Sequence, residues 1–188
     1  MAKSKNKIKD KIKSELDLPN DVTVSLSESI LTVKGPKGEV IKDIKKYKVS
    51  VKIDSKKMIL ESGKATKKNK KMLGTLTSQV KNMFKGVLQN HTYILKICSG
   101  HFPMNVSAAN NRLSIKNFLG EKTPRILELK NGADVKVEGG LIYITSPNKE
   151  IAGQVSADIE QLTRRPGYDT RIFQDGCYII VKDGKELK

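Results

Sequence analysis

The chain has 188 residues, 37% hydrophobic and 30% charged, and its 36 Lys and Arg outnumber 20 Asp and Glu, giving a net charge of +16. This excess predicts a polyanionic partner. The longest apolar run, Cys177–Val181, has five residues, whereas a membrane-spanning helix needs about 20. No apolar stretch follows the N-terminal lysines, and two cysteines are too few for a disulfide framework. We therefore expect no membrane contact, no secretory signal and a cytoplasmic location, with passage through the nucleus of a nucleated cell.

The first half of the chain is the more basic one: residues 1–94 hold 22 basic and 9 acidic residues. We expect a basic N-terminal extension over 1–15 and a first folded repeat over 16–90. Apolar and polar residues alternate in Val22–Leu26 and Val49–Ile53, which is typical of half-buried antiparallel strands, and Gly35–Gly38 marks a turn between strands. A helix follows, because apolar residues recur at helical spacing at Leu73, Leu76, Val80, Phe84 and Val87.

The pattern then repeats. Leu31–Lys34 recurs as Leu113–Lys116 at an offset of 82 residues, and Val51–Asp54 recurs as Val135–Glu138 at an offset of 84. We therefore expect a second repeat over 91–170, with its own helix beginning after an Asn148 cap. The predicted fold class is α+β: two duplicated small domains, each an antiparallel-rich sheet with one helix packed on a face.

The C-terminal segment, 171–188, is expected to form a basic hairpin or tail. Pro166 and Gly167 end the second helix. Asp175-Gly176 lies between two apolar stretches, and Asp-Gly is a strong signal for a two-residue hairpin turn.

The sequence contains few candidates for catalytic or metal-binding residues. No phosphate-binding loop is present, and His91, Cys98 and His101 lack the fourth ligand of a folded zinc site. Carboxylate pairs such as Asp134 with Glu138 have the pattern of solvated surface. The sequence therefore predicts no enzyme, no catalytic residue, no cofactor, no metal and no small-molecule substrate.

Two basic clusters are candidates for binding RNA. In the first, four lysines open a helix, where they repel one another and oppose the helix dipole unless an anion is near; the alternative is a solvated, partly frayed helix start. In the second, arginines alternate with aromatic residues, which suits phosphates and unpaired bases, although Phe173 is expected to pack in the core of the hairpin. The predicted RNA-binding residues are Lys67, Lys68, Lys70, Lys71, Arg164, Arg165, Tyr168, Arg171 and Lys182, with Phe173 and Tyr178 as neighbours in the second cluster.

Several motifs resemble those of one family. Leu31–Gly38, then His101–Val106 and Ile115–Lys122, and finally Arg171–Lys182 with Gln161 ten residues earlier, are similar to the signatures of the universal large-subunit ribosomal protein family L-six, in the branch called L-nine in eukaryotes. The resemblance covers nearly the whole chain in order. It departs at Arg165, Tyr168 and Cys177, where the family pattern has aliphatic, basic and aliphatic residues.

This resemblance implies two duplicated α+β domains and a structural role on the large ribosomal subunit. It also implies contact with large-subunit rRNA near the sarcin-ricin loop and the stalk base, with neighbouring ribosomal proteins as partners and translation factors nearby. The alternative is a free-standing RNA or DNA chaperone that binds polyanions without a fixed site. An enzyme acting on RNA would need a metal–carboxylate or histidine-based site, which the residues do not supply.

Overall fold

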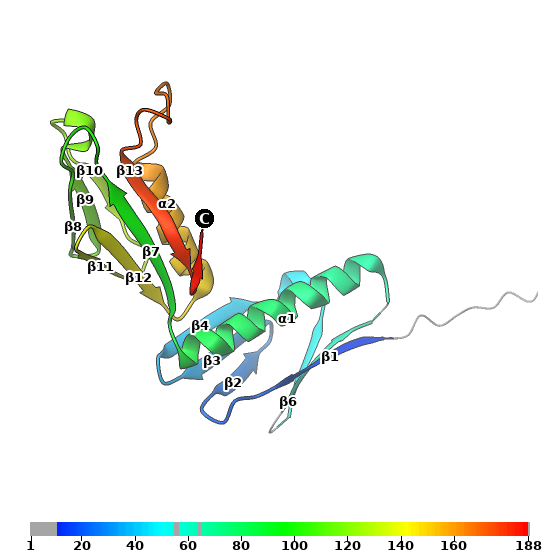
Figure 1. Ribbon diagram of the computed structural model, residues 1–188. Coiled ribbons are helices and arrows are strands. Elements are labelled where there is room, and N and C mark those ends of the chain that lie inside the picture. The colour runs from blue at the N-terminus through cyan, green and yellow to red at the C-terminus, as the bar shows by residue number, and fades with distance from the viewer. Residues whose placement is uncertain (1–10, 55–56, 64, 188) are drawn as a thin grey trace, which may run out of the picture. The chain divides into compact units, whose positions relative to one another are not determined.

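The computed structural model describes residues 11–54, 57–63 and 65–187. The chain forms two compact units, the first ending at Leu88 and the second beginning at Gln89. Figure 1 shows each unit with its own sheets and its own helix. The first ten residues of the expected N-terminal extension lie outside the described residues. The rest of that stretch is not an extension: a strand begins at Ile12, because alternating apolar residues give it one buried face. Within the described chain, no helix is long and apolar enough to cross a membrane.

The first unit consists of two antiparallel sheets with one helix packed on both. The sheet orders are β1-β6-β5 and β2-β3-β4, and α1 contacts β1 and β6 of one sheet and β3 and β4 of the other. The elements are β1 (Ile12–Asp17), β2 (Thr23–Ser27), β3 (Ile30–Gly35), β4 (Gly38–Asp43), a 3-10 turn η1 (Lys45–Tyr47), β5 (Ser50–Ile53), β6 (Lys57–Ser62) and α1 (Lys67–Leu88).

The second unit has the same plan with one addition. Its sheets are β10-β9-β8 and β11-β12-β7-β13-β14, and α2 contacts both. The last two strands extend the larger sheet beyond β7. The elements are β7 (His91–Cys98), β8 (Asn105–Ala109), β9 (Arg112–Lys116), a 3-10 turn η2 (Phe118–Gly120), β10 (Arg125–Glu128), β11 (Asp134–Glu138), β12 (Leu141–Ser146), α2 (Lys149–Leu162), β13 (Gly176–Lys182) and β14 (Lys185–Glu186).

The two units are copies of one design, which confirms the duplication seen in the sequence. Leu31 of β3 and Leu113 of β9, 82 residues apart, are both fully buried at the centre of a three-stranded sheet. The strand pair β1-β6 of the first unit corresponds to β7-β12 of the second, and both pairs are antiparallel. A buried serine, Ser62 or Ser146, ends the second strand of each pair. The α+β class is thereby confirmed, with two sheets in each unit where one was expected.

The helices follow their predicted stripes. All five apolar positions of the stripe predicted over 73–87 are buried on α1. At the start of α2, Asn148 Oδ1 accepts a hydrogen bond from Glu150 N at 2.9 Å, which is the expected cap. Both helices therefore cover their sheets with the apolar face that the sequence indicates.

The predicted turn at Gly35–Gly38 is a tight hairpin turn between β3 and β4, and it contacts the end of α1. Gly35 pairs with Gly38 across the hairpin, and Lys37 N donates to Val87 O at 3.0 Å. A Cβ atom at Gly35 would lie 2.8 Å from Val87 Cγ2. Glycine is needed here because the strand and the helix approach so closely.

The C-terminal hairpin turns at a different place from the predicted one. The residues before Asp175 form no strand; β13 runs from Gly176 to Lys182 as the partner of β7, and the chain turns at Asp183-Gly184 into β14. Segment 171–188 therefore belongs to the second unit. Asp183 and Gly184 both take positive φ, 51° and 82°, as a two-residue type I′ turn requires, whereas Asp175 does not.

Candidate nucleic-acid interface

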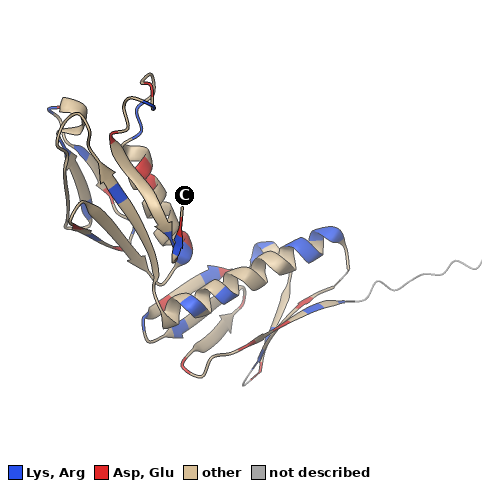
Figure 2. Cartoon of the chain, in the orientation of Figure 1, with Lys and Arg blue, Asp and Glu red and all other residues tan. Residues whose placement is uncertain are grey.

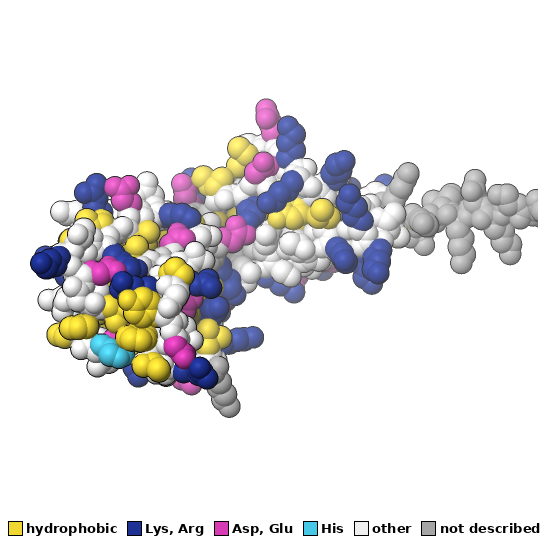
Figure 3. Space-filling view, turned by 90° about the horizontal axis from the view of Figure 1, so that it is seen from above, with side chains coloured by type: hydrophobic (Ala, Val, Ile, Leu, Met, Phe, Trp, Pro, Cys, Tyr) yellow, Lys and Arg dark blue, Asp and Glu magenta, His cyan; other side chains and the backbone are white. Residues whose placement is uncertain are grey.

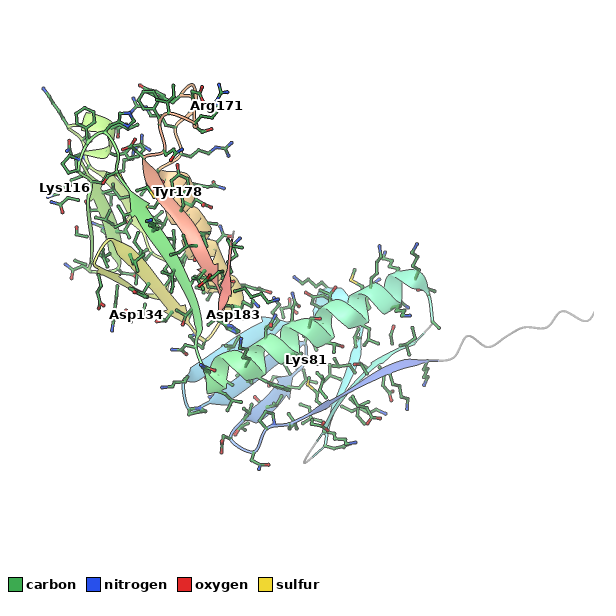
Figure 4. The ribbon with its side chains drawn as sticks, viewed as in Figure 1. Lys81, Lys116, Asp134, Arg171, Tyr178 and Asp183 are labelled. Atoms are coloured by element: carbon green, nitrogen blue, oxygen red, sulfur yellow. The ribbon has the colours of Figure 1, made fainter. Side chains whose placement is uncertain are left out.

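A loop between α2 and β13, residues 163–175, carries most of the predicted RNA-binding residues of the second cluster. The helix ends at Leu162, Pro166 cannot continue it, and Gly167 takes a positive φ of 86°. Figure 4 shows Arg171 of this loop and Tyr178 of β13 at the same end of the second unit. The loop borders an open pocket of about 510 Å³, here called the α2-end pocket, which is lined among others by Gln161, Thr163, Arg164, Arg165, Tyr168, Phe173 and Tyr178.

A row of stacked side chains, here called the ring ladder, holds this loop in place. The Arg165 guanidinium lies 4.6 Å from the centre of the Tyr168 ring, and the Tyr168 ring meets Phe173 edge-on at 4.9 Å. Phe173 in turn stacks on His101 at 4.7 Å. The ring of Phe173 is half-buried in this ladder and not in a hairpin core, because the residues around it form no hairpin. Such contacts hold the loop in place although, within the described chain, it forms no backbone hydrogen bonds with a neighbouring strand.

Asp175 anchors the base of the loop. Its side chain is almost fully buried, and it accepts hydrogen bonds from Gly100 N at 2.7 Å and from His101 N at 3.0 Å; its other oxygen lies 2.6 Å from His101 Nδ1. Burial alone would raise the pKa of Asp175, but the hydrogen bonds from His101 and Gly100 outweigh burial and lower it. The carboxylate therefore holds the base of the 163–175 loop against the 100–101 loop.

Arg125, at the start of β10, is a structural arginine that connects Glu121, Phe118 and the end of α2. Its Nε and Nη2 bind both oxygens of Glu121 at 2.8 and 2.7 Å, its Nη1 donates to the carbonyl oxygen of Leu162 at the end of α2, and its guanidinium lies 4.3 Å from the Phe118 ring. The side-chain bond from Arg125 is the main cause that lowers the pKa of Glu121. Glu121 also pairs with Arg165 at 3.2 Å. The spacing of four residues between Glu121 and Arg125 was the only signal of this pair in the sequence.

The guanidinium groups of the three predicted arginines differ in the partners that they have within the chain. Arg164 is exposed, and its guanidinium has no partner among the residues that the structure describes. Arg171 forms a two-pronged pair with Asp169, at 2.8 and 3.1 Å, which lowers the pKa of the Asp169 carboxyl. Arg165 belongs to the ring ladder and to Glu121. Of the three, Arg164 is thus the one whose charge is not already compensated within the described chain.

Lys182 is not part of this cluster. It lies at the opposite end of β13, six residues from Gly176, and a strand of that length spans about 20 Å. Its neighbours across the sheet are Tyr93 and Lys185. Figure 4 shows the adjacent Asp183 at the other end of the unit from Arg171. The structure therefore brings together Arg164, Arg165, Tyr168 and Arg171 but leaves Lys182 apart.

The lysine cluster of the first unit forms the exposed start of α1. Thr66 Oγ1 accepts from Asn69 N at 3.2 Å, so the helix start is capped. All four lysines are exposed, and none has a carboxylate partner among the described residues. The helix contains no acidic residue along its whole length, and Figure 2 shows Lys and Arg concentrated at its start. The start of α1 is thus an exposed basic surface formed by Lys67, Lys68, Lys70 and Lys71.

The three potential metal ligands do not gather at one place. His91 and Cys98 lie at opposite ends of β7, about 23 Å apart for seven residues of strand. His91 is fully buried with Nδ1 2.9 Å from Asp183 Oδ1, and His101 pairs with Asp175. Within residues 11–54, 57–63 and 65–187, no three His, Cys, Asp or Glu side chains gather as a metal site would require.

The repeated strand order and the basic, aromatic loop together define a duplicated α+β protein of two sheets and one helix per unit. Comparisons with known proteins place it more closely. The family profile described as Ribosomal protein L6 matches the chain twice, over residues 18–90 and 102–176. The chain belongs to the ribosomal protein L6 family.

Its relatives are similar over almost their full length. The large ribosomal subunit protein uL6 of Methanococcus vannielii is 40% identical over 176 residues, which cover 94% of this chain and 97% of that protein. The uL6 protein of Saccharolobus solfataricus is 38% identical over 173 residues, with 92% and 96% covered. That of Methanocella arvoryzae is 40% identical over 169 residues, with 89% and 96% covered. The resemblance seen in the sequence motifs is therefore confirmed.

Proposed function

We propose that this chain is a structural protein of the large ribosomal subunit that binds large-subunit rRNA and supports translation. Membership of the L6 family and the names of the relatives support this assignment. The structural observation that carries it is the free basic charge on both units: Arg164 beside a row of aromatic rings, and the lysines at the start of α1. Guanidinium and ammonium groups without carboxylate partners bind phosphates without first breaking an internal ion pair.

The proposed site on the subunit is the rRNA near the sarcin-ricin loop and the stalk base, where translation factors dock. The family resemblance supports this placement, and neighbouring large-subunit proteins are the proposed protein partners. The protein then works on cytoplasmic ribosomes, after passage through the nucleus and nucleolus in a nucleated cell. It acts as a scaffold and not as an enzyme. Protection of the sarcin-ricin loop from chemical cleavage when the chain binds its subunit tests the placement.

The general assignment is tested by binding the full chain to a large-subunit rRNA transcript and to a random RNA duplex of equal length. Each phosphate contact contributes about 0.7–0.9 to the slope of log affinity against log salt concentration. We expect clearly tighter binding to rRNA, and a weaker affinity with a smaller slope when Arg164, Arg165 and Arg171 are all changed to Ala. Equal affinity for both RNAs would favour the general polyanion chaperone.

A further inference from the structure

We propose that the α2-end pocket receives one unstacked nucleotide of RNA, with its base against the ring of Tyr178 and its phosphate on Arg164. This inference rests on the proposed function and deepens it, because it names the part of an RNA that this site selects. At about 510 Å³, the pocket is within the usual size of small-ligand sites, roughly 300–1,000 Å³. Figure 3 shows hydrophobic side chains beside a histidine and basic side chains on one face of the molecule.

Tyr178 supplies the free aromatic surface. Its side chain lines the pocket, is 40% exposed, and has neither a ring partner nor a hydrogen-bond partner among the described residues. The rings of Tyr168, Phe173 and His101 are instead occupied with one another in the ring ladder. Partial burial raises the pKa of the Tyr178 phenol, so the hydroxyl remains a neutral donor. A partly exposed ring without a ring partner, carrying an uncommitted hydroxyl, suits a planar base.

Gly176, two residues before Tyr178 in β13, leaves space for the Tyr178 ring. A Cβ at Gly176 would lie 3.4 Å from the ring and 3.2 Å from Thr163 Oγ1, a contact tighter than side chains usually make. Thr163 Oγ1 also accepts from Cys177 N at 3.0 Å. Glycine therefore lets the ring lie close to the end of α2, where the polar groups of the pocket are.

Polar groups around the ring match a nucleotide. Arg164 and Gln161 lie at the end of α2, both are exposed, and neither side chain has a partner among the described residues. A guanidinium binds a phosphate through several donors, and an amide offers both a donor and an acceptor to a base edge. Two carboxylates also line the pocket, but Glu160 accepts from Ile179 N at 3.3 Å and Asp175 is bonded to the 100–101 loop. The uncommitted groups are thus those that suit an anion and a base.

Paired RNA does not offer a base face to the Tyr178 ring. Side chains cannot read the narrow major groove of an RNA duplex, and stacked bases hide their faces, whereas a base outside the stack exposes both its face and its edge. A base must therefore leave the helix to reach Tyr178. The proposal predicts that the protein prefers RNA with an extruded nucleotide to the same RNA fully paired.

The test compares two RNA hairpins that differ only in one bulged nucleotide, 2-aminopurine, whose fluorescence reports stacking. We expect the full chain to bind the bulged hairpin more tightly and to change its fluorescence. Tyr178→Leu should weaken binding of the bulged hairpin by roughly five- to a hundredfold and leave the paired hairpin unaffected, because base–aromatic stacking is lost. Tyr178→Phe, the matched control, should keep the preference.

Two further measurements separate a loss of RNA binding from a loss of folding, and an RNA site from a site for free nucleotides. Arg164→Gln, at an exposed position, should weaken binding to both hairpins without changing the unfolding temperature, and adenosine monophosphate at millimolar concentration should not displace the bulged RNA. Equal affinity of the wild type for both hairpins, or an unchanged preference in a folded Tyr178→Leu protein, overturns the proposal. Displacement by micromolar adenosine monophosphate overturns it in favour of a free-nucleotide site. Failure to bind large-subunit rRNA, with the bulge preference intact, would instead refute the proposed function alone.

Discussion

The same substitution at two arginines, Arg125 of β10 and Arg164 just after α2, should affect different properties of the protein. Arg125→Gln removes two bonds to Glu121, one bond to the carbonyl of Leu162 and the stacking on Phe118. Arg164→Gln removes a charge that has no partner among the described residues. We therefore expect Arg125→Gln to lower stability and Arg164→Gln to lower RNA affinity.

The size of the stability effect follows from burial. The Arg125 and Glu121 side chains are 22% and 28% exposed, so solvent screens the pair only in part. Hydrogen bonds to charged groups contribute about 1.5–3 kcal/mol when buried, and exposed ion pairs about 0–1 kcal/mol. An intermediate loss of about 2 kcal/mol lowers the unfolding temperature of a 100-residue unit by roughly 10 °C. Arg164→Gln should change stability by less than about 0.5 kcal/mol.

The assay is denaturant unfolding of both variants at pH 7 and at acidic pH, paired with rRNA binding across salt concentrations. Glu121 has its pKa lowered from 4.5, mainly by the bond from Arg125. The stability it contributes is present above its unfolded pKa and is lost as the pH falls through the lowered value. The difference between wild type and Arg125→Gln should therefore shrink below pH 4.5. Equal stability of the two variants at pH 7, or a salt slope unchanged by Arg164→Gln, would refute this division of roles.

Other changes test the fold. Gly35→Ala should lower the free energy of unfolding by about 1–3 kcal/mol, because its Cβ would lie 2.8–2.9 Å from Val87 atoms. Gly74→Ala, at an open helix position, should raise it by about 1 kcal/mol. Urea unfolding measures both, and an unchanged stability of Gly35→Ala would contradict the close approach. Asp175→Asn should flatten the loss of stability below pH 3.8, since the lowered pKa of Asp175 gives stability that disappears as pH falls through it; an unchanged pH profile of unfolding would show that the carboxylate does not anchor the loop.

The spacing of apolar and capping residues along the chain predicted the helices and their buried faces. The buried stripe of α1 and the Asn148 cap are set by residues within a few positions of one another. The duplication was visible because Leu31 and Leu113 occupy equivalent buried sites. Alternation does not show which strands pair, so the division of each unit into two sheets could not be read from the sequence.

The hairpin and the arginines required non-local information. Asp175-Gly176 and Asp183-Gly184 carry the same turn signal. Only Asp183 and Gly184 both take the positive φ of a two-residue type I′ turn, whereas Asp175 accepts hydrogen bonds from Gly100 and His101 of another loop. Likewise, the residue type alone does not distinguish the role of Arg125 from that of Arg164. Their roles separate only when α2 brings the carbonyl of Leu162 to Arg125 and leaves Arg164 exposed.

The most direct measurement is sedimentation of the tagged full chain from cell lysate through a sucrose gradient, before and after a high-salt wash that releases loosely bound cations. Phosphate contacts alone weaken steeply as the salt concentration rises, so retention after the wash requires further contacts to a fixed site on the subunit. We predict that the protein stays with the large ribosomal subunit after the wash. Migration as free protein, or complete release by salt, would contradict the assignment to the large subunit.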